Sequence, residues 1–129
     1  MMFGLQHKSV AVVWLIILAV VLVESLVPYG SPQLAQQYGD IVLHLICFYF
    51  LAFLPMYNAA TVRQGIFLSL LMAVVGAGIE MAQLFIPGRD CSPEDIFTNN
   101  IGVALGVVMG GLLRWKKKAS MEGPCERRS

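Results

Sequence analysis

Four long apolar stretches follow one another along the chain, and short segments rich in polar residues, proline or glycine separate them. A bilayer core about 30 Å thick requires about 20 helical residues to cross it. Three of the stretches have about this length, whereas the second is shorter and ends near Pro55. The backbone polar groups of a segment in lipid must be hydrogen-bonded within the chain, so we interpret each stretch as a helix. The predicted spans cover residues 10–27, 41–56, 66–86 and 96–113.

The segments between the spans carry residues that favour turns and helix ends. Residues 28–32 separate the first two spans, residues 58–65 separate the next two, and a Pro-Gly pair at 87–88 ends the third. Ser92 followed by Pro93 is typical of a helix start. A hydroxyl there caps the first turn, and proline fits the first helical position.

The composition supports a membrane protein. Of the 129 residues, 57% are hydrophobic and 13% are charged, whereas soluble domains carry about 25% charged residues. This apolar content excludes a disordered chain, and three scattered cysteines exclude a small disulfide-rich module. A chain of this size also has too little interior to hide so many apolar side chains from water. We therefore predict an all-α, polytopic membrane four-helix bundle, with residues 1–129 forming a single domain.

The basic residues indicate the orientation of the bundle. Lys8, Arg63 and the basic residues of the tail 114–129 fall on one side of a four-span topology, and only Arg89 falls on the other. By the positive-inside rule, both termini are predicted to be cytoplasmic. The first span is longer than a usual signal-peptide core and lacks a small-residue cleavage site, so we expect it to be retained. We interpret Trp115 and its neighbouring lysines as an interfacial anchor that meets anionic headgroups, not as a nucleic-acid-binding segment.

Polar residues gather toward the predicted outer ends of the spans. Three pairs are spaced three or four positions apart, which places the members of each pair on one helix face. A charge that faces lipid costs several kcal/mol, so these groups are expected to turn inward. We predict a polar pocket at the outer membrane surface, with Glu24 at similar depth and Arg89 at the centre, where it holds a carboxylate through two hydrogen bonds. The pairs are Asp40 with His44, Glu80 with Gln83, and Asp95 with Asn99.

Each of these residues also has a purely structural interpretation. A lone His44 is more often an interhelical hydrogen-bond donor than a catalyst, and Glu80 with Arg89 is consistent with a structural ion pair. Asp95 fits the first turn of a helix, where an acidic group interacts favourably with the helix dipole, and Asn99 is typical of hydrogen bonds between membrane helices. A structural bundle of this size has no need for so many ionisable groups in one layer, so we favour a functional site.

Glycines recur at every fourth position of the fourth span, at Gly102, Gly106 and Gly110. This spacing permits two helix backbones to approach each other closely. We interpret it as packing within the chain, not dimerisation, with Gly76 and Gly78 as the facing surface on the third span.

Two sequence elements resemble motifs of the VanZ-like family of small membrane proteins. The family's Asp-Lys-x-x-His element is present as Asp40-Ile41-Val42-Leu43-His44, with Ile41 in place of the lysine. The second element has the pattern Glu-x-x-Gln, Pro-Gly-Arg, then Asp-x-x-x-Asn-x-x-Gly, and it is the more specific because several polar types recur at fixed intervals. It corresponds to Glu80-Met81-Ala82-Gln83, Pro87-Gly88-Arg89, and Asp95, Asn99 and Gly102.

The resemblance implies a multi-pass protein of the bacterial cytoplasmic membrane. The family takes its name from accessory resistance to teicoplanin-type glycopeptide antibiotics, and other members are associated with envelope and exopolysaccharide genes. A settled biochemical activity does not come with the resemblance, so the function must be argued from the residues.

The interpretation that we favour is a protein that binds or remodels an anionic lipid or lipid-linked glycan of the cell envelope. Arg89 would contact a phosphate as a planar fork, and Asp40, Gln83, Asp95 and Asn99 would complete the ligand-binding set. The excess of carboxylates counts against a site for a bare anion, because unpaired carboxylates repel phosphate.

Two alternatives remain open. In the first, the protein is a small structural subunit of an envelope complex, and its polar residues pair with a partner's helices. In the second, it is an outer-leaflet transferase or hydrolase that uses His44, as a general base oriented by Asp40, and the carboxyl group of Glu80. We expect no cofactor, metal or nucleic-acid partner, since the chain has two histidines and His7 falls on the side opposite to His44.

Overall fold

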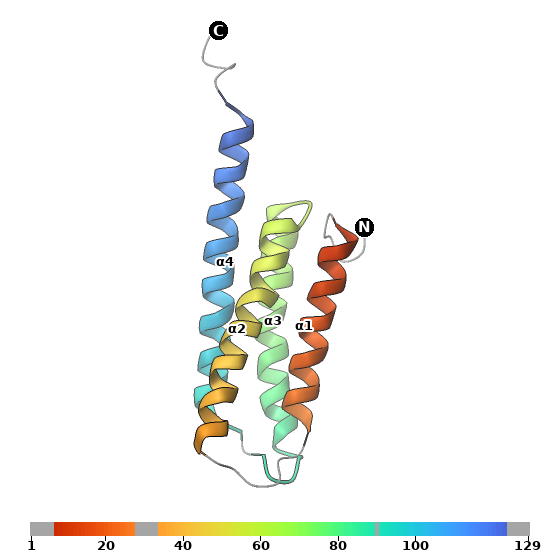
Figure 1. Ribbon diagram of the computed structural model, residues 1–129, viewed down its shortest axis with the longest axis vertical. Helices are drawn as coiled ribbons and strands as arrows, with labels where there is room; N and C mark the ends of the chain where they lie inside the picture. Colours follow the sequence, from red (N-terminus) through yellow and green to blue (C-terminus); the bar gives the residue numbers. More distant parts are fainter. Residues whose placement is uncertain (1–6, 28–33, 90, 124–129) are drawn as a thin grey trace.

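The computed structural model describes residues 7–27, 34–89 and 91–123. Over these residues the chain forms four helices, and each runs antiparallel to the one before it (Figure 1). All four are long and apolar enough to cross a membrane, which confirms the predicted all-α membrane four-helix bundle. The helices are α1 (Lys8–Leu26), α2 (Leu34–Asn58), α3 (Val62–Gln83) and α4 (Pro93–Met121).

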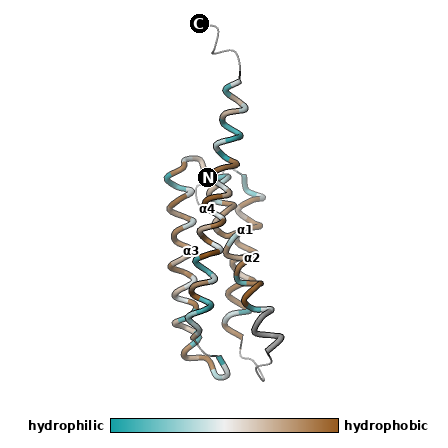
Figure 2. Tube along the Cα trace, turned by 90° about the vertical axis from the view of Figure 1, so that its left-hand side faces the viewer, coloured by the Kyte–Doolittle hydropathy of each residue, from teal (hydrophilic) through white to brown (hydrophobic). Residues whose placement is uncertain are grey.

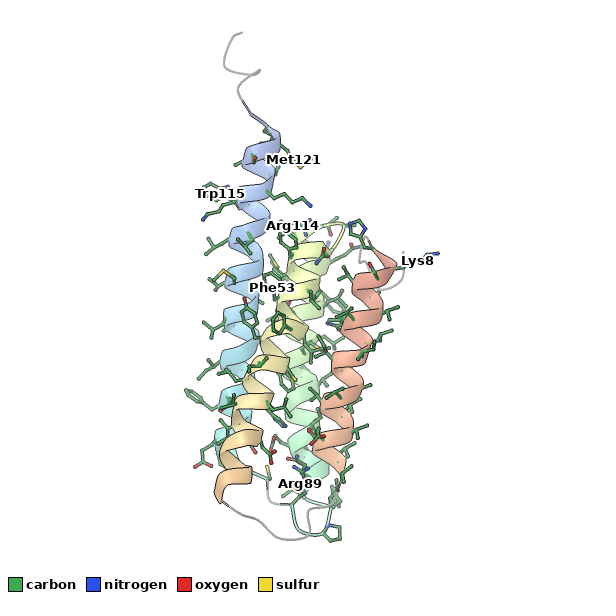
Figure 3. All side chains as sticks on the ribbon, in the orientation of Figure 1. Lys8, Phe53, Arg89, Arg114, Trp115 and Met121 are labelled. Atoms are coloured by element: carbon green, nitrogen blue, oxygen red, sulfur yellow. The ribbon has the colours of Figure 1, made fainter. Side chains whose placement is uncertain are left out.

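The two described ends of the chain lie at the same end of the bundle. Lys8 and Arg114 are near this end, and Arg89 lies at the opposite one (Figure 3). We call these two ends of the bundle the Arg114 end and the Arg89 end. α4 is the longest helix, with 29 residues, and it continues beyond the others at the Arg114 end (Figure 1). At about 1.5 Å per residue it is about 43 Å long, so its last turns extend past a lipid core of about 30 Å.

α2 differs most from its predicted span. It has 25 residues, extends past 41–56 at both ends, and contains Pro55 in its interior. Proline lacks an N–H, so the carbonyl of Leu51, four residues earlier, loses its helical partner. The indole Nε1 of Trp14 on α1 donates a 2.8 Å hydrogen bond to that carbonyl. The contact with α1 thus satisfies the group that the proline leaves open, and α2 continues beyond it.

The connectors also differ from the prediction. α3 begins at Val62, where the Thr61 hydroxyl accepts a 3.2 Å hydrogen bond from Gln64 N, so Arg63 lies on the helix and not in the connector. α3 ends three residues before the predicted position 86, because the chain continues in tight turns with i to i−3 hydrogen bonds. The predicted turn at 28–32 lies outside the described residues.

α4 starts where the Ser-Pro pair predicted it. Ser92 occupies the N-cap and Pro93 follows in the first turn of the helix. The predicted hydroxyl cap is wrong, because Ser92 Oγ donates a 2.8 Å hydrogen bond to Glu94 Oε2 instead of accepting one from the first turn. The backbone N–H of Ser92 is used elsewhere, as described below.

The glycine stripe of α4 faces α2, and these two helices share the largest interface among the described residues. A Cβ on Gly102 would lie 2.8 Å from the carbonyl oxygen of Leu45, and Gly106 and Gly110 approach the α2 backbone in the same way. No side chain fits between the two backbones, which confirms the prediction of close packing within the chain.

The predicted partner surface for this stripe is wrong. Gly76 on α3 instead faces the ring of Phe48 and the side chain of Asn99, and Gly78 has open space around it. Because α2 lies against the glycine stripe, α3 contacts α4 through α4 residues outside the stripe, such as Asn99.

Both the interior and the exterior of the bundle are apolar. The core cluster includes Trp14, Phe48, Leu51, Met72 and Val103, while many other large apolar side chains are exposed on the outer helix faces. Figure 2 shows hydrophobic residues along the middle of the helices and hydrophilic ones over the protruding end of α4. An apolar exterior of this extent suits contact with lipid tails. In an interior that is also apolar, the buried polar groups are the feature that requires explanation.

Candidate functional site

Five buried polar side chains form a layer in the half of the bundle nearer the Arg89 end, and every helix contributes at least one. We call this set the polar layer. Four of the five take part in hydrogen bonds between helices, which shows that they meet in space. The set consists of Ser25 on α1, His44 on α2, Glu80 and Gln83 on α3, and Asn99 on α4.

His44 joins three helices through its ring. Its Nδ1 lies 3.2 Å from Asn99 Oδ1, and its Nε2 lies 3.4 Å from Ser25 Oγ. An amide oxygen only accepts hydrogen bonds, so Nδ1 carries a proton. In the neutral ring, Nε2 is then an acceptor for the Ser25 hydroxyl. The result is a directed chain from Ser25 through His44 to Asn99.

The two α3 residues of the layer connect it to neighbouring backbone. Gln83 Nε2 donates a 3.0 Å hydrogen bond to the carbonyl of Ser25, which ties α3 to α1. Glu80 Oε2 accepts a 3.3 Å hydrogen bond from the backbone N–H of Ser92, at the start of α4. The Glu80 side chain is fully buried, and this hydrogen bond fixes one of its two carboxylate oxygens.

Within the described part of the chain, two polar atoms of the layer have no hydrogen-bond partner. They are Glu80 Oε1 and Asn99 Nδ2, and both are buried. One is an acceptor and the other is a donor. Nearly all buried polar atoms in proteins are paired, so each exception requires an explanation such as a bound group.

Arg89 fastens the connector after α3 to the end of α1. Its Nε donates a 3.1 Å hydrogen bond to the carbonyl of Val27, and its Nη2 donates to the carbonyl of Glu24. The last carbonyls of a helix lack helical partners and carry partial negative charge, which suits a guanidinium. The Glu24 side chain itself is exposed, so only its backbone takes part.

Charged groups surround the layer at this end. Asp95 interacts electrostatically with His44, Asp40 and Arg89, and Glu80 interacts with Asp95 and Arg89. Asp40, Asp95 and Arg89 are half-buried, so they lie between the buried layer and the surface. The structure thus brings together the seven residues that the sequence singled out, namely Asp40, His44, Glu80, Gln83, Arg89, Asp95 and Asn99.

Ser25 is the residue that the sequence reasoning missed. It is the only hydroxyl-bearing residue in the first predicted span, 10–27, and that was the available signal. Glu24 stands out in this span because of its charge, but adjacent helix positions point about 100° apart, and Ser25 is the one that faces inward. In the described part of the chain, no group of three His, Cys, Asp or Glu side chains gathers in a way that suits a metal ion.

No curated protein matches the chain, and no solved structure does so either. The family model described as VanZ/LLP1 matches residues 5–114. This range contains α1, α2, α3 and α4 as far as Arg114, and with them the whole polar layer. Together with four helices that are able to cross a membrane, this match identifies the chain as a multi-pass membrane protein that belongs to the VanZ/LLP1 family.

Proposed function

We propose that the protein binds a lipid-linked glycan, or another anionic lipid that carries hydroxyl groups, at the polar layer. The observation that carries the proposal is the pair of buried, unpartnered atoms, Glu80 Oε1 and Asn99 Nδ2. A buried polar group left unpaired costs about 1–3 kcal/mol. Because a sugar hydroxyl both donates and accepts, a glycan supplies a donor for the carboxylate and an acceptor for the amide.

The two atoms belong to one region of the bundle. Gly76 and Glu80 lie one turn apart on the same face of α3, and a Cβ on Gly76 would lie 3.3 Å from Asn99 Nδ2. The amide nitrogen therefore faces the stripe of α3 that carries the carboxylate. A ligand with several hydroxyl groups would suit this arrangement because it could offer a separate partner to each atom.

The charge balance favours a glycan over a bare anion. Glu80 and Asp95 interact with the guanidinium of Arg89, and Asp40 interacts with Asp95, so carboxylates outnumber guanidinium groups among the described residues of this region. A free phosphate would be repelled by this excess. A glycan linked through phosphate keeps its phosphate near Arg89 and offers neutral hydroxyl groups to the carboxylates.

We place this site at the outer face of the bacterial cytoplasmic membrane. The support is the positive-inside rule, since Lys8, Arg63 and the lysines after Arg114 belong to the opposite end of the topology. An outer-face site for a lipid-linked glycan would also account for the roles that the family resemblance implies, in teicoplanin-type resistance or exopolysaccharide production.

Binding of a labelled polyprenyl-phosphate sugar to the purified protein in neutral detergent tests the proposal. Asn99→Leu removes the unpartnered donor, and Asn100→Leu is the matched control because the Asn100 side chain is exposed and bonds only to its own helix, at Ile96 O. We expect Asn99→Leu to weaken binding about tenfold or more and Asn100→Leu to change it less than about twofold.

Equal affinities of the two variants, with both proteins folded, would contradict the proposal. Asn99→Leu also removes the acceptor of His44, so Glu80→Gln gives a second test that keeps the side-chain size. It neutralises the carboxylate and is expected to weaken binding of the sugar as well. The melting temperature of each variant without ligand separates a loss of binding from a loss of folding.

A second candidate function is catalysis, because Ser25, His44 and Asn99 stand in the order of nucleophile, base and orienting group. The Ser25 oxygen would attack an acyl or phosphoryl centre of a lipid-linked substrate, and its proton would pass to His44 Nε2 and then to the leaving oxygen. The 3.4 Å distance between Ser25 Oγ and His44 Nε2 is long for a nucleophile and its base, which favours binding instead. Turnover that Ser25→Ala abolishes while binding persists would favour the enzyme.

A further inference from the structure

A second constellation of charged groups lies at the Arg114 end, far from the polar layer. Arg114 on α4 donates from Nη1 to the carbonyls of Met56 at 3.2 Å and Ala59 at 2.8 Å, and from Nη2 to the carbonyl of Ala60 at 3.3 Å. These carbonyls belong to the end of α2 and to the turn that follows it. Arg114 thus fixes the protruding part of α4 against the end of α2.

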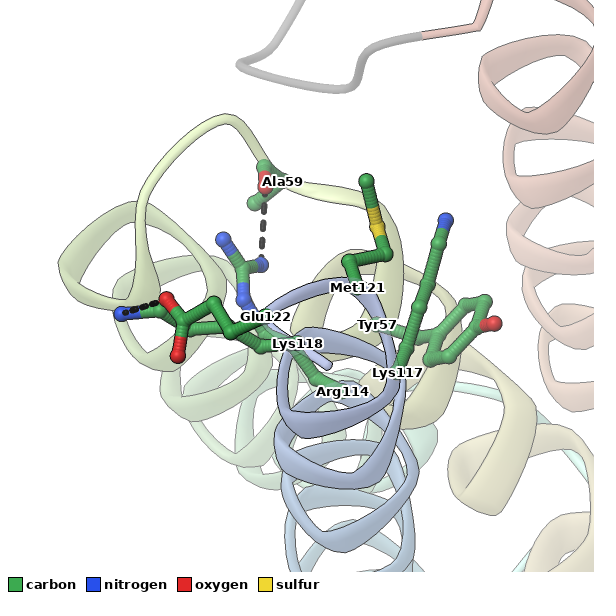
Figure 4. A pocket seen from close by; sticks show the side chains of 7 residues that line it. All are labelled: Tyr57, Ala59, Arg114, Lys117, Lys118, Met121 and Glu122. Carbon is green, nitrogen blue, oxygen red and sulfur yellow. Dashed lines mark hydrogen bonds and ion pairs between the residues drawn. The ribbon is translucent and has the colours of Figure 1, made fainter. Parts of the chain in front are cut away.

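A pocket of about 360 Å³ lies beside this contact, between the end of α2 and the last turns of α4 (Figure 4). Its walls are polar and basic on the α4 side and aromatic on the α2 side. Lys117 Nζ lies 5.5 Å from the centre of the Tyr57 ring, so a cation–π contact orients this lysine. The residues that line it include Tyr57, Arg114, Lys117, Lys118, Met121 and Glu122.

The pocket carries an excess of positive charge. It has three basic side chains and one carboxylate, Glu122, which lies 3.7 Å from Lys118 Nζ. Both partners of this ion pair are well exposed, and such pairs contribute little to stability. Lys118 is therefore available to a stronger anion, and phosphate is the group for which one arginine and two lysines are best suited.

The surroundings of the pocket indicate a lipid, not a soluble anion. The α4 positions before Arg114 present exposed apolar side chains, among them Leu112 and Leu113. Trp115, the next residue, is exposed, as is typical at the level of lipid headgroups. A phosphate in the pocket would thus lie about one helical turn of α4 from exposed apolar side chains, along which acyl chains fit.

We propose that this pocket is a binding site for the phosphate headgroup of an anionic membrane lipid. Binding in this pocket differs from a diffuse attraction of the basic tail to the membrane, because one defined set of side chains makes the contact. It is also independent of the glycan site, since the two lie at opposite ends of the bundle. The headgroup phosphate would lie beside Arg114, and the exposed side chains of Lys117 and Lys118 would turn toward it from either side, while the acyl chains would run along α4.

Lipid binding to the purified full-length protein, measured by native mass spectrometry from a neutral detergent, tests this inference. The probes are phosphatidylglycerol, phosphatidylcholine as the neutral lipid, and inorganic phosphate as the free anion. The Lys117→Ala/Lys118→Ala double variant removes two pocket cations. Lys116→Ala/Arg63→Ala is the charge-matched control, because both residues are exposed and neither lines the pocket.

We expect the pocket variant to weaken phosphatidylglycerol binding at least about tenfold more than the control does. Equal losses in the two variants would overturn the inference in favour of diffuse charge attraction. Inorganic phosphate that competes as well as the lipid would overturn it in favour of a free-anion site. Unchanged melting temperatures in phosphatidylcholine show that the variants are folded, and Lys117→Arg/Lys118→Arg is expected to restore binding.

Discussion

At the scale of single residues, side chains that donate to the backbone of a neighbouring helix hold this bundle together. Gln83 donates to the carbonyl of Ser25, Trp14 donates to that of Leu51, and Ser69 donates to that of Ala52 at 2.8 Å. Lipid tails are as apolar as the interior of the bundle. Burying apolar side chains inside it therefore gives little preference for one helix arrangement over another. These bonds supply that preference, because each one is satisfied only when the correct helix is adjacent.

Trp14 gives the clearest test of this idea. Trp14→Phe keeps an aromatic ring but removes the donor, and we expect the free energy of unfolding in detergent to fall by about 1–3 kcal/mol because Leu51 O is left unpaired. In a Pro55→Ala background the new N–H of residue 55 supplies a helical partner for this carbonyl, so the same substitution should cost less.

The matched control is Trp115→Phe, since the chain has two tryptophans and this one is exposed. We expect it to leave the free energy of unfolding nearly unchanged. An identical cost of Trp14→Phe with and without Pro55 would show that the tryptophan contributes packing alone.

The residue scale is also where prediction from sequence reaches its limit. Spacing of three or four placed His44, Glu80 and Asn99 correctly on shared helix faces, because polar residues in an apolar span mark the inward side. Apolar residues occur on every side of α1, so the single hydroxyl of Ser25 was the one mark of its inward side, and it was missed beside the charge of Glu24. Two acceptors of Arg89 are the backbone carbonyls of Val27 and Glu24, and a backbone acceptor leaves no trace in the sequence.

At the scale of helices, hydropathy predicted all four spans because lipid requires about 20 apolar residues in each. The helix ends were harder, since they lie among headgroups and water where polar residues are equally acceptable. α2 therefore begins before its apolar stretch, and α4 continues through its lysines to Met121. Pro55 was predicted near the end of its span, and the structure keeps it inside α2 because α1 provides the missing hydrogen-bond donor.

The contact between α2 and α4 can be tested through the glycines. A Cβ on Gly106 would contact the carbonyl of Tyr49 and lie 2.9 Å from both Ala52 Cβ and Phe53 N. The backbone atoms of α2 cannot move aside unless the two helices separate. We therefore expect Gly106→Ala to lower the free energy of unfolding by about 1–3 kcal/mol.

Gly78→Ala is the control for this substitution. Gly78 lies in the interior of α3, and a Cβ added there would have no neighbouring atom within 4 Å. Alanine favours the helix over glycine by about 1 kcal/mol, so this variant should be as stable as the parent or more so. The pair is compared by unfolding in the same detergent. A Gly106→Ala variant that is as stable as Gly78→Ala would show that the two helices are not in tight contact.

At the scale of the whole molecule, the bundle separates two kinds of charged site. The Arg89 end has buried polar groups with an excess of carboxylates, and the Arg114 end has a basic pocket under a protruding helix. Four antiparallel helices place the two described ends of the chain together at the basic end (Figure 1). A membrane in which the inner side attracts basic residues would orient the molecule with the polar layer outward.

Cysteine labelling tests this orientation directly. In a background with Cys47, Cys91 and Cys125 replaced by serine, Phe85→Cys places a thiol at a side chain that is 87% exposed at the Arg89 end, and Ser120→Cys places one on the protruding turns of α4. We expect a membrane-impermeant maleimide to label the Phe85→Cys variant in intact cells and the Ser120→Cys variant only after permeabilisation. The positive-inside rule sets this expectation through the bias of Lys8, Arg63 and Arg114 against Arg89. The reverse pattern would place the polar layer on the cytoplasmic side and exclude an outer-leaflet ligand, whereas the geometry of the layer itself would stand.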